Sequence, residues 1–377
     1  MCYTLIWVAP QKFIIAFVPL REVEGRKLFL LSQNKNKEDN MKTQSFNEIE
    51  NLTKEYSMIP ICKEIYADVI TPIQLLRKME AFDKNFFLLE SVEGGEKWAR
   101  YSFLGYEPVL HITCKNGKVT QKSGEIEHTV TVDPMDALRQ LLHKYKSPKI
   151  EGMPTFTGGF VGYFGYEMIG YAEPKLNIKD SEFDDYNLML FDKVIVYDHL
   201  KQKIMVIANM KSKDGIQGYN TALLEIEKMI ALINDQRKLP VLEADKDVKF
   251  KCNVTKEEYC RMIEKTKHYI KEGDIFQGVI SRRFVADYKS SLINAYRVLR
   301  TTNPSPYMYF IQSDDLQIAG ASPETMVKLV DGKLTTFPVA GTRPRGVNDE
   351  QDKTLEKELL ADEKELAENN MLVDLAR

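Results

Sequence analysis

The most informative pattern in the chain is a loop followed by an acid-rich helix, FPVAGTRPRGVNDEQDKTLEKELLADEKELAENNMLVDLAR (residues 337–377). The loop carries Gly341, Gly346 and two arginines, and a loop of this composition can present backbone N–H groups and cations to an anionic ligand. The helix places Glu365 and Glu368, three residues apart, on one face, where two carboxylates can hold a hard divalent cation. The same spacing is also typical of a solvated helix surface, so the pattern alone leaves both interpretations open.

Composition excludes several classes of function. The 377 residues are 44% hydrophobic and 28% charged, which is typical of a soluble globular protein with one large or two interlocked domains. A net charge of −3 gives no broad basic surface, so we expect no nucleic-acid partner. The five cysteines form no CxxC pair and do not cluster with the five histidines. We therefore expect neither a disulfide framework nor a zinc site, and a reducing, cytoplasmic compartment.

The first twenty residues are the only segment that resembles a targeting signal. They are apolar, but Pro10, Lys12 and Pro19 interrupt them and no basic stretch precedes the apolar run. This pattern fits neither a membrane span nor a signal peptide, so we expect no membrane partner. A polar run follows, and Met41 begins a more regular sequence. Residues 1–40 are therefore expected to be an N-terminal extension.

Hydrophobic periodicity and turn residues predict a mixed α/β chain. Helices are expected over residues 72–82, 134–145, 220–234, 256–272 and 291–301, the fourth behind a capping box of Thr255 and Glu258. Strands are expected over 109–114, 128–132, 188–198, 203–209, 307–312, 316–319 and 326–330, with another after Gly273 and a short turn in GDIFQGVISRRF (273–284). The charged stretch 236–250 has no clear period, so we expect a linker there, between an N-terminal region (41–235) and a C-terminal domain (251–377).

A second glycine-rich segment, GGFVGYFGYE (158–167), needs a separate interpretation. It lacks the Lys-Ser/Thr pair of a P-loop and the acidic partner of a dinucleotide site. We therefore interpret its glycines as positions where strands pack closely, rather than as a phosphate site.

Several stretches together resemble the chorismate-utilising enzyme family, and within it the large subunits of anthranilate synthases. They are LLES (88–91), GDIFQ (273–277), NPSPYM (303–308), GASPE (320–324), PVAGTRPRG (338–346) and DEKELAENNMLVDLAR (362–377). The resemblance covers about residues 59–377 and leaves the first 40 without a counterpart. It implies an α/β (α+β) fold of two stacked, mostly antiparallel sheets flanked by helices, in which the N- and C-terminal parts interlock.

Two positions distinguish the branches of this family. Aminodeoxychorismate synthases typically carry a nucleophilic lysine where this chain has Ala340, and isochorismate and salicylate synthases carry a lysine base where it has Gln277. Neither alanine nor a neutral amide can supply that chemistry. The resemblance therefore implies anthranilate synthase component I, with aminodeoxychorismate synthase component I as the alternative.

The resemblance implies that the matching residues of this chain carry out the family's chemistry. Glu365 and Glu368 would hold Mg²⁺ against the ring carboxylate of chorismate, and ammonia would add to the ring before pyruvate leaves to give anthranilate. Gly341 and Thr342 match the substrate loop. Glu324 matches the carboxylate near the leaving hydroxyl, with a structural ion pair at a strand end as the alternative. Asn369 stands where the family usually has histidine.

A feedback site for L-tryptophan is also implied by the resemblance. Glu90 and Ser91 match the residues that bind the inhibitor's ammonium and polar atoms. The loop that packs on tryptophan is matched by Asn303, Pro306, Tyr307 and Met308. A carboxylate suits an ammonium, and apolar and aromatic side chains suit an indole. The alternative is that Asn303–Pro306 simply forms a rigid turn.

Two further expectations concern partners and length. The chain has no Gly-Cys-Gly elbow of an amidotransferase, so a glutamine amidotransferase subunit is expected to supply ammonia in a hetero-oligomer. Family members continue beyond the LVDLAR motif, so we expect this chain to be C-terminally truncated and to turn over no chorismate alone. A non-catalytic tryptophan-binding fragment is the corresponding alternative.

Overall fold

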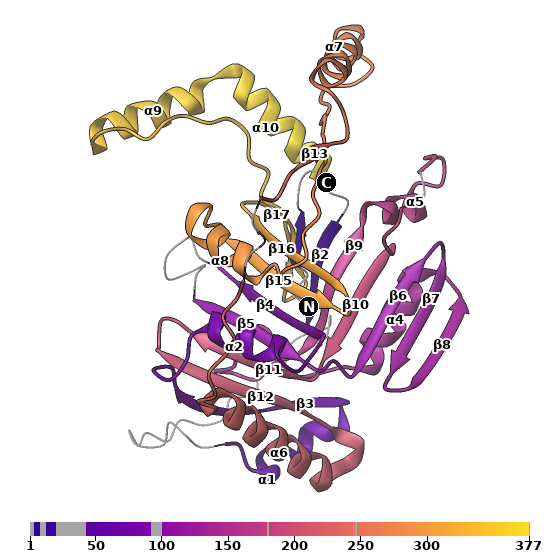
Figure 1. Ribbon diagram of the computed structural model, residues 1–377, viewed down its shortest axis with the longest axis vertical. Helices are drawn as coiled ribbons and strands as arrows, with labels where there is room; N and C mark the ends of the chain where they lie inside the picture. Colours follow the sequence, from indigo (N-terminus) through magenta and orange to yellow (C-terminus); the bar gives the residue numbers. More distant parts are fainter. Residues whose placement is uncertain are drawn as a thin grey trace.

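The structure is a computed structural model that describes residues 4–7, 13–19, 43–91, 100–178, 181–243, 245 and 247–376, with only the backbone described for the first two ranges. Two large sheets dominate it, and every strand pairing in them is antiparallel (Figure 1). Strands from distant parts of the sequence lie side by side in both sheets. The expected interlocking of N- and C-terminal parts is therefore confirmed.

The seven-stranded sheet has the order β16-β15-β4-β5-β11-β12-β3. Its strands are β3 (Met58–Tyr66), β4 (Asn85–Glu90), β5 (Tyr101–Tyr106), β11 (Lys193–Asp198), β12 (Lys203–Lys211), β15 (Tyr307–Ser313) and β16 (Leu316–Ser322). The pairing of β4 with β15 aligns Glu90 with Met308, two residues more than 200 positions apart in the chain. This pairing joins the two halves of the predicted tryptophan site.

The nine-stranded sheet has the order β18-β17-β1-β2-β9-β10-β6-β7-β8. Its strands are β1 (Thr4–Trp7), β2 (Phe13–Pro19), β6 (Leu110–Lys115), β7 (Lys118–Ser123), β8 (Ile126–Thr131), β9 (Gly159–Gly165), β10 (Tyr186–Phe191), β17 (Thr325–Val330) and β18 (Lys333–Thr335). Residues 1–40, expected to be an extension, thus contribute two strands to it. A third sheet consists of β13 (Lys251–Cys252) and β14 (Phe284–Val285).

Helices cover the outer faces of the stacked sheets. The seven-stranded sheet carries α2 (Pro72–Glu80), α6 (Gly215–Asn234) and α8 (Ile293–Thr302), whose apolar side chains share one buried cluster with it. The nine-stranded sheet packs against α4 (Pro134–Lys144). A further cluster holds side chains from both sheets, so a second part of the core lies between them. The predicted architecture of two stacked antiparallel sheets flanked by helices is confirmed.

Strand β4 shows why the sequence folds into these layers. Phe86 and Leu88 point into the cluster beneath the helices, whereas Phe87 and Leu89 point into the core between the sheets. A strand buried on both faces needs apolar residues at consecutive positions. The apolar run at 86–89 meets this requirement.

The interpretation of the glycine-rich segment as a close-packed strand is confirmed. Gly162 lies in β9 and pairs with Leu188 of β10. A Cβ atom added at Gly162 would overlap the carbonyl oxygen of Asn187 and lie 2.8 Å from the Cα of Leu188. Only glycine fits this close approach of two backbones.

The strand expected over residues 188–198 is wrong as a single element. The chain breaks at Asp192 and passes from β10 in one sheet to β11 in the other. The carbonyl of Asp192 accepts from the backbone N–H of Asn209 at 2.7 Å and from its Nδ2 at 2.9 Å. These bonds hold the crossing point, and the polar pair Asp192-Lys193 interrupts the apolar run at this position.

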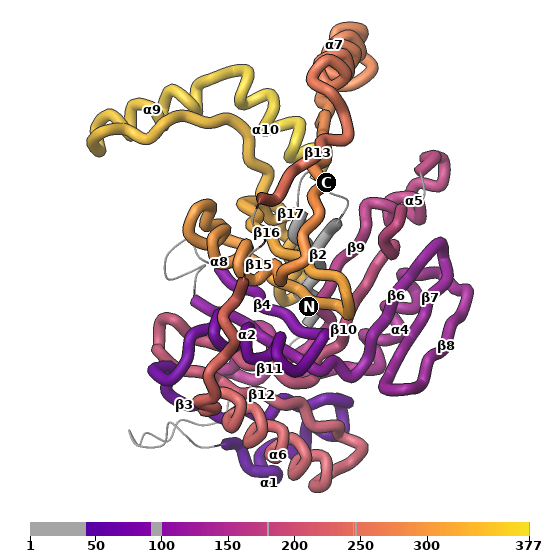
Figure 2. Tube along the Cα trace, in the orientation of Figure 1, coloured from indigo at the N-terminus to yellow at the C-terminus, as the bar shows by residue number. Residues whose placement is uncertain are grey.

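The strand expected after Gly273 is also wrong for most of its length, because residues 274–283 form neither helix nor strand and only β14 follows. The preceding helix, α7 (Lys256–Glu272), has the predicted capping box and a left-handed Gly273 at its C-terminal end. Figure 2 shows α7 projecting from the sheets, as do α9 (Asp349–Ala361) and α10 (Glu363–Ala376). These three helices contain no buried residue.

The remaining elements are short. They are α1 (Phe46–Ile49), α5 (Ile169–Ala172) and 3₁₀ turns at Glu50–Lys54, Tyr166–Met168 and Ser212–Asp214. Within the described ranges, no helix has the length and apolar character needed to cross a membrane. Cys62, Cys114, Cys252 and Cys260 are free thiols.

Candidate functional site

The loop that carries Gly341 packs directly against the carboxylate helix α10. Gly341 has a left-handed backbone (φ +80°), and a Cβ atom there would lie 2.9 Å from Glu365 Oε2 and 2.9 Å from Leu359 Cδ1. Asn369 Nδ2 also donates to the carbonyl of Pro338 at 3.3 Å. The structure therefore brings the predicted substrate loop and the first predicted metal ligand together.

Arg343 fixes the loop to the helices. Its Nη2 donates to Asp362 Oδ2 at 2.7 Å and its Nε to Glu358 Oε1 at 3.3 Å, while its Nη1 lies 3.9 Å from Glu365 Oε1. The second arginine of the loop, Arg345, pairs with Asp352 at 2.6 Å. Both arginines thus pair with carboxylates of α9 or of the connection to α10, and Arg345 remains largely exposed, so the expectation that they present cations to an anionic ligand stays a prediction.

Asp362 joins the loop to the start of α10. Its Oδ1 accepts from the backbone N–H groups of Lys364 at 3.0 Å and Glu365 at 3.2 Å, which caps the helix. The N–H of Glu365, together with the Arg343 guanidinium, holds the pKa of Asp362 below its usual value. One carboxylate therefore orients both Arg343 and the first turn that carries Glu365.

The Mg²⁺ site expected at Glu365 and Glu368 stays a prediction. Glu365 and Glu368 are half-buried and one turn apart on α10. Among the described residues, no group of three or more His, Cys, Asp or Glu side chains is arranged to hold a metal. Because Mg²⁺ commonly uses one or two carboxylates and takes its other ligands from water and substrate, two glutamates are compatible with it.

Glu324 and Gln277 lie on exposed connections. Glu324 lies between β16 and β17, and Gln277 lies in the irregular segment after α7. Among the described residues, neither side chain forms a hydrogen bond or ion pair, so the alternative of a structural ion pair at Glu324 is not observed. No such bond connects either of them to Gly341, Thr342 or the α10 glutamates.

The predicted tryptophan residues gather at the ends of β4 and β15. Glu90 ends β4, half-buried Ser91 follows it, and Tyr307 and Met308 begin β15. Asn303 directly follows α8, and its backbone N–H donates to the carbonyl of Leu299 at 2.9 Å. Pro306 is half-buried in the same turn. The structure thus places these residues along one strand pair and the turn that leads into it.

Glu90 is held by a cluster that the sequence did not reveal. Tyr296 OH donates to Glu90 Oε1 at 2.7 Å, and Arg300 Nη2 donates to Oε2 at 3.0 Å. On the neighbouring strand, Ser102 pairs with Glu90 in register, and its hydroxyl lies 2.7 Å from His199 Nε2. Tyr296 and Arg300 are 206 and 210 residues from Glu90 in the chain, so no local motif connects them.

Lowering the pH from about 7 to about 5 is expected to destabilise the fold through His199. Burial lowers the pKa of His199 below its ordinary value; Arg300 reinforces this shift, whereas Glu90 and Asp198 oppose it. The unfolded chain therefore takes up the proton first, so stability falls as the pH decreases through the interval between the two pKa values. Melting temperatures recorded against pH should show a shallower acid slope for His199→Gln. The exposed His128→Gln should keep the wild-type slope, and identical slopes for all three proteins would contradict this account.

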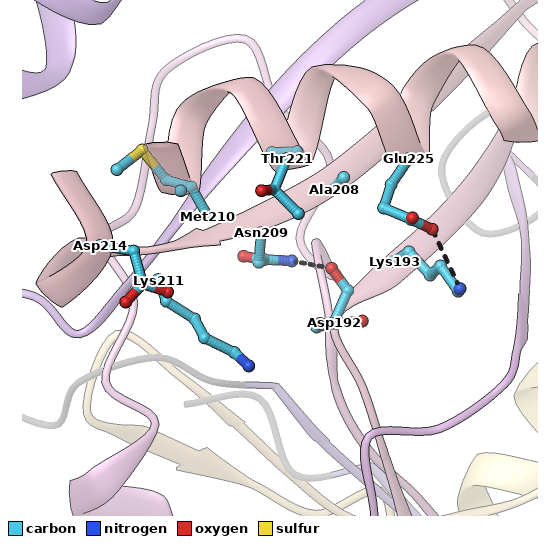
Figure 3. A pocket seen from close by; sticks show the side chains of 11 residues that line it. Asp192, Lys193, Ala208, Asn209, Met210, Lys211, Asp214, Thr221 and Glu225 are labelled. Carbon is cyan, nitrogen blue, oxygen red and sulfur yellow. Dashed lines mark hydrogen bonds and ion pairs between the residues drawn. The ribbon is translucent and has the colours of Figure 1, made fainter. Parts of the chain in front are cut away.

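Two cavities of the described structure lie elsewhere. One of about 120 Å³ is formed by α6, β12 and the crossing point at Asp192, where Lys193 Nζ lies 3.2 Å from Glu225 Oε2 (Figure 3). Burial raises the pKa of Asp192. Another of about 270 Å³ lies between α2 and residues 233–239. No predicted site residue lines either cavity, so packing and hydrogen bonds define the candidate site.

Comparison with known proteins decides the family. The family model of chorismate binding enzymes matches residues 84–377, more than half of the chain. The chain belongs to the chorismate binding enzyme family. This range includes the loop, α10 and the Glu90 cluster.

Several similar relatives share one description. The chain is 41% identical to anthranilate synthase component 1 of Acetivibrio thermocellus over 88% of this chain and 69% of that protein. It is 39% identical to the Aquifex aeolicus protein of the same name, over the same shares. The crystal structure of anthranilate synthase component I from Streptococcus pneumoniae TIGR4 matches with 32% identity and a TM-score of 0.63, covering 82% of this chain and 66% of that one. The chain thus spans about two thirds of the length of these relatives.

These relatives place the chain in the anthranilate synthase component 1 branch of the family, rather than in the aminodeoxychorismate synthase branch. Ala340 and Gln277 had predicted the same branch from the sequence. The resemblance identified from the short motifs is therefore confirmed over most of the chain.

Proposed function

We propose that the protein converts chorismate and ammonia into anthranilate and pyruvate, the first step of tryptophan biosynthesis. The observation that carries this proposal is Ala340, directly before the substrate loop. An alanine cannot attack the ring as a lysine would, and Gln277 cannot deprotonate water, so free ammonia is the nucleophile. The relatives named above support the same reaction.

The residues of the loop and α10 have distinct roles in this proposal. Gly341 and Thr342 contact chorismate, and Glu365 and Glu368 hold Mg²⁺. When bound, Mg²⁺ orients the ring carboxylate and withdraws electrons from the ring. Arg343 and Asp362 keep the loop against α10, and Glu324 acts near the leaving hydroxyl. The contact between Gly341 and Glu365 supports a shared site for the substrate and the metal.

Regulation and partners complete the proposal. L-Tryptophan binds at Glu90 and Ser91 with its indole on Pro306, Tyr307 and Met308, and it inhibits the reaction. A glutamine amidotransferase subunit, component II, supplies ammonia within a hetero-oligomer in the cytoplasm. The pairing of Glu90 with Met308 across β4 and β15 supports the effector role, because it places a carboxylate for the ammonium beside the residues proposed to receive the indole.

Product identity tests the reaction. The purified chain is incubated with chorismate, ammonium and Mg²⁺, and the products are separated by chromatography. Whatever turnover the chain supports should give anthranilate with an equal amount of pyruvate. An amino-chorismate without pyruvate would contradict the proposal and establish the aminodeoxychorismate branch.

A non-catalytic tryptophan-binding protein is the second candidate. The observation that favours it is the pairing of β4 with β15, which brings Glu90 and Met308 together, whereas among the described residues no group of three or more His, Cys, Asp or Glu side chains is arranged to hold a metal. That the chain alone turns over no chorismate stays a prediction. Calorimetric titrations with tryptophan and with chorismate separate the candidates, because binding of tryptophan alone would favour this second function.

A further inference from the structure

The carboxylate of Glu90 is already paired with a cation of its own chain. The Glu90 side chain is only 2% exposed, and the Arg300 guanidinium lies against it. Nη2 donates to Oε2 at 3.0 Å, and Nε is in ion-pair contact with Oε1. Tyr296 OH completes the set at 2.7 Å from Oε1. The described structure therefore leaves little of this carboxylate for a ligand.

Arg300 is the accessible member of this group. Tyr296 and Arg300 are four residues apart on α8, so they project from the same face of the helix. Tyr296 is completely buried, whereas the Arg300 side chain is 28% exposed. Of the two groups that cover Glu90, the guanidinium is the one that can move into solvent without exposing apolar surface.

A ligand ammonium at Glu90 would lie close to the Arg300 guanidinium, and both groups are positively charged. Like charges in close contact repel, more strongly in a buried site than in water. His199, beside Ser102, is kept neutral by burial near neutral pH and does not replace the missing positive charge once Arg300 leaves. A ligand that brings its own ammonium would restore the charge balance at Glu90.

We propose that Arg300 is a built-in competitor of the effector, and that an α-ammonium binds Glu90 only by displacing the Arg300 guanidinium. The inference rests on the proposed role of Glu90 as the ammonium site. Arg300 then lowers the affinity for the effector instead of contributing to its binding. Because Asn303 and Pro306 directly follow α8, the displaced residue lies one turn from the loop that receives the indole.

Removing the charge of Arg300 should therefore strengthen effector binding. Calorimetry on the full chain compares L-tryptophan, tryptamine, which lacks the carboxylate, and indole-3-propionate, which lacks the ammonium. In Arg300→Met, the Kd values of tryptophan and tryptamine should fall at least tenfold, with no change for indole-3-propionate. Arg297→Met is the matched control, because Arg297 lies on the same helix and bonds only to Asn294 among the described residues, at 3.0 Å.

Two further results keep the proposal open to refutation. Arg300→Lys keeps a cation beside Glu90 but loses the two-nitrogen contact, so it should fold and show an intermediate gain in affinity. Weaker binding of tryptophan and indole-3-propionate in either variant would overturn the proposal, since Arg300 would then grip the ligand's carboxylate. An absence of tryptophan binding in wild type and Arg300→Met alike would overturn it as well. These are binding measurements, so they are independent of whether the protein forms anthranilate.

Discussion

Among substitutions that add one methyl group to a strand of the described sheets, Gly162→Ala is expected to cause the largest loss of stability. The new Cβ would overlap the carbonyl oxygen of Asn187 and press on Leu188 Cα, and neither backbone atom can rotate away. Overpacking of this kind costs about 3 kcal/mol or more when backbone must shift. Domains are commonly stable by only about 5–15 kcal/mol, so much of the folded population should be lost.

Chemical denaturation measures this effect as the free energy of unfolding. Gly170→Ala is a suitable control, because Gly170 lies in the short helix α5 and a Cβ there would meet only Ile178 Cγ1, at 3.7 Å. The control should be as stable as wild type. A Gly162→Ala protein with wild-type stability would show that β9 and β10 do not approach as closely as described.

Gly341→Ala is expected to have the largest effect on the proposed chorismate site. The left-handed backbone at Gly341 makes any side chain unfavourable by about 1–2 kcal/mol. In addition, a Cβ would press on Glu365 Oε2 and on Leu359, both at 2.9 Å. The loop would have to move away from α10, so Mg²⁺-dependent chorismate binding should weaken at least tenfold.

Gly332→Ala separates the two causes. Gly332 has nearly the same backbone angle (φ +75°), but a Cβ there meets no atom within 4 Å. Both variants should lose similar stability to backbone strain, and only Gly341→Ala should lose chorismate affinity. Equal affinities for the two variants in calorimetric titration would show that the contact with Glu365 is not part of the site.

The sequence predicted most elements of the fold because their signals are local. The capping box at Thr255 and the glycine after Glu272 set both ends of α7. The polar pair Asp192-Lys193 marks the break within the apolar run, but the change of sheet there depends on hydrogen bonds from Asn209 that form only after the sheets assemble.

In the candidate site too, local patterns identified individual residues but not their partners. Spacing placed Glu365 and Glu368 on one helix face, and motif resemblance selected Gly341 and Glu90. The partners of these residues are distant in sequence: Arg300 lies 210 residues from Glu90, and Arg343 reaches across the loop to Asp362. Contacts of this kind depend on the packing of whole elements, so no short pattern could have revealed them.

The most direct test of the account is a calorimetric titration of chorismate into the chain, with and without Mg²⁺. Wild type should bind chorismate with an affinity that rises with Mg²⁺, and the exposed Glu363→Gln on the same helix should behave identically. A Glu365→Gln, Glu368→Gln double variant that remains folded should lose the increase in chorismate affinity that Mg²⁺ gives. If the double variant binds chorismate as wild type does with Mg²⁺ present, the assignment of α10 as the metal-bearing wall of a chorismate site is contradicted.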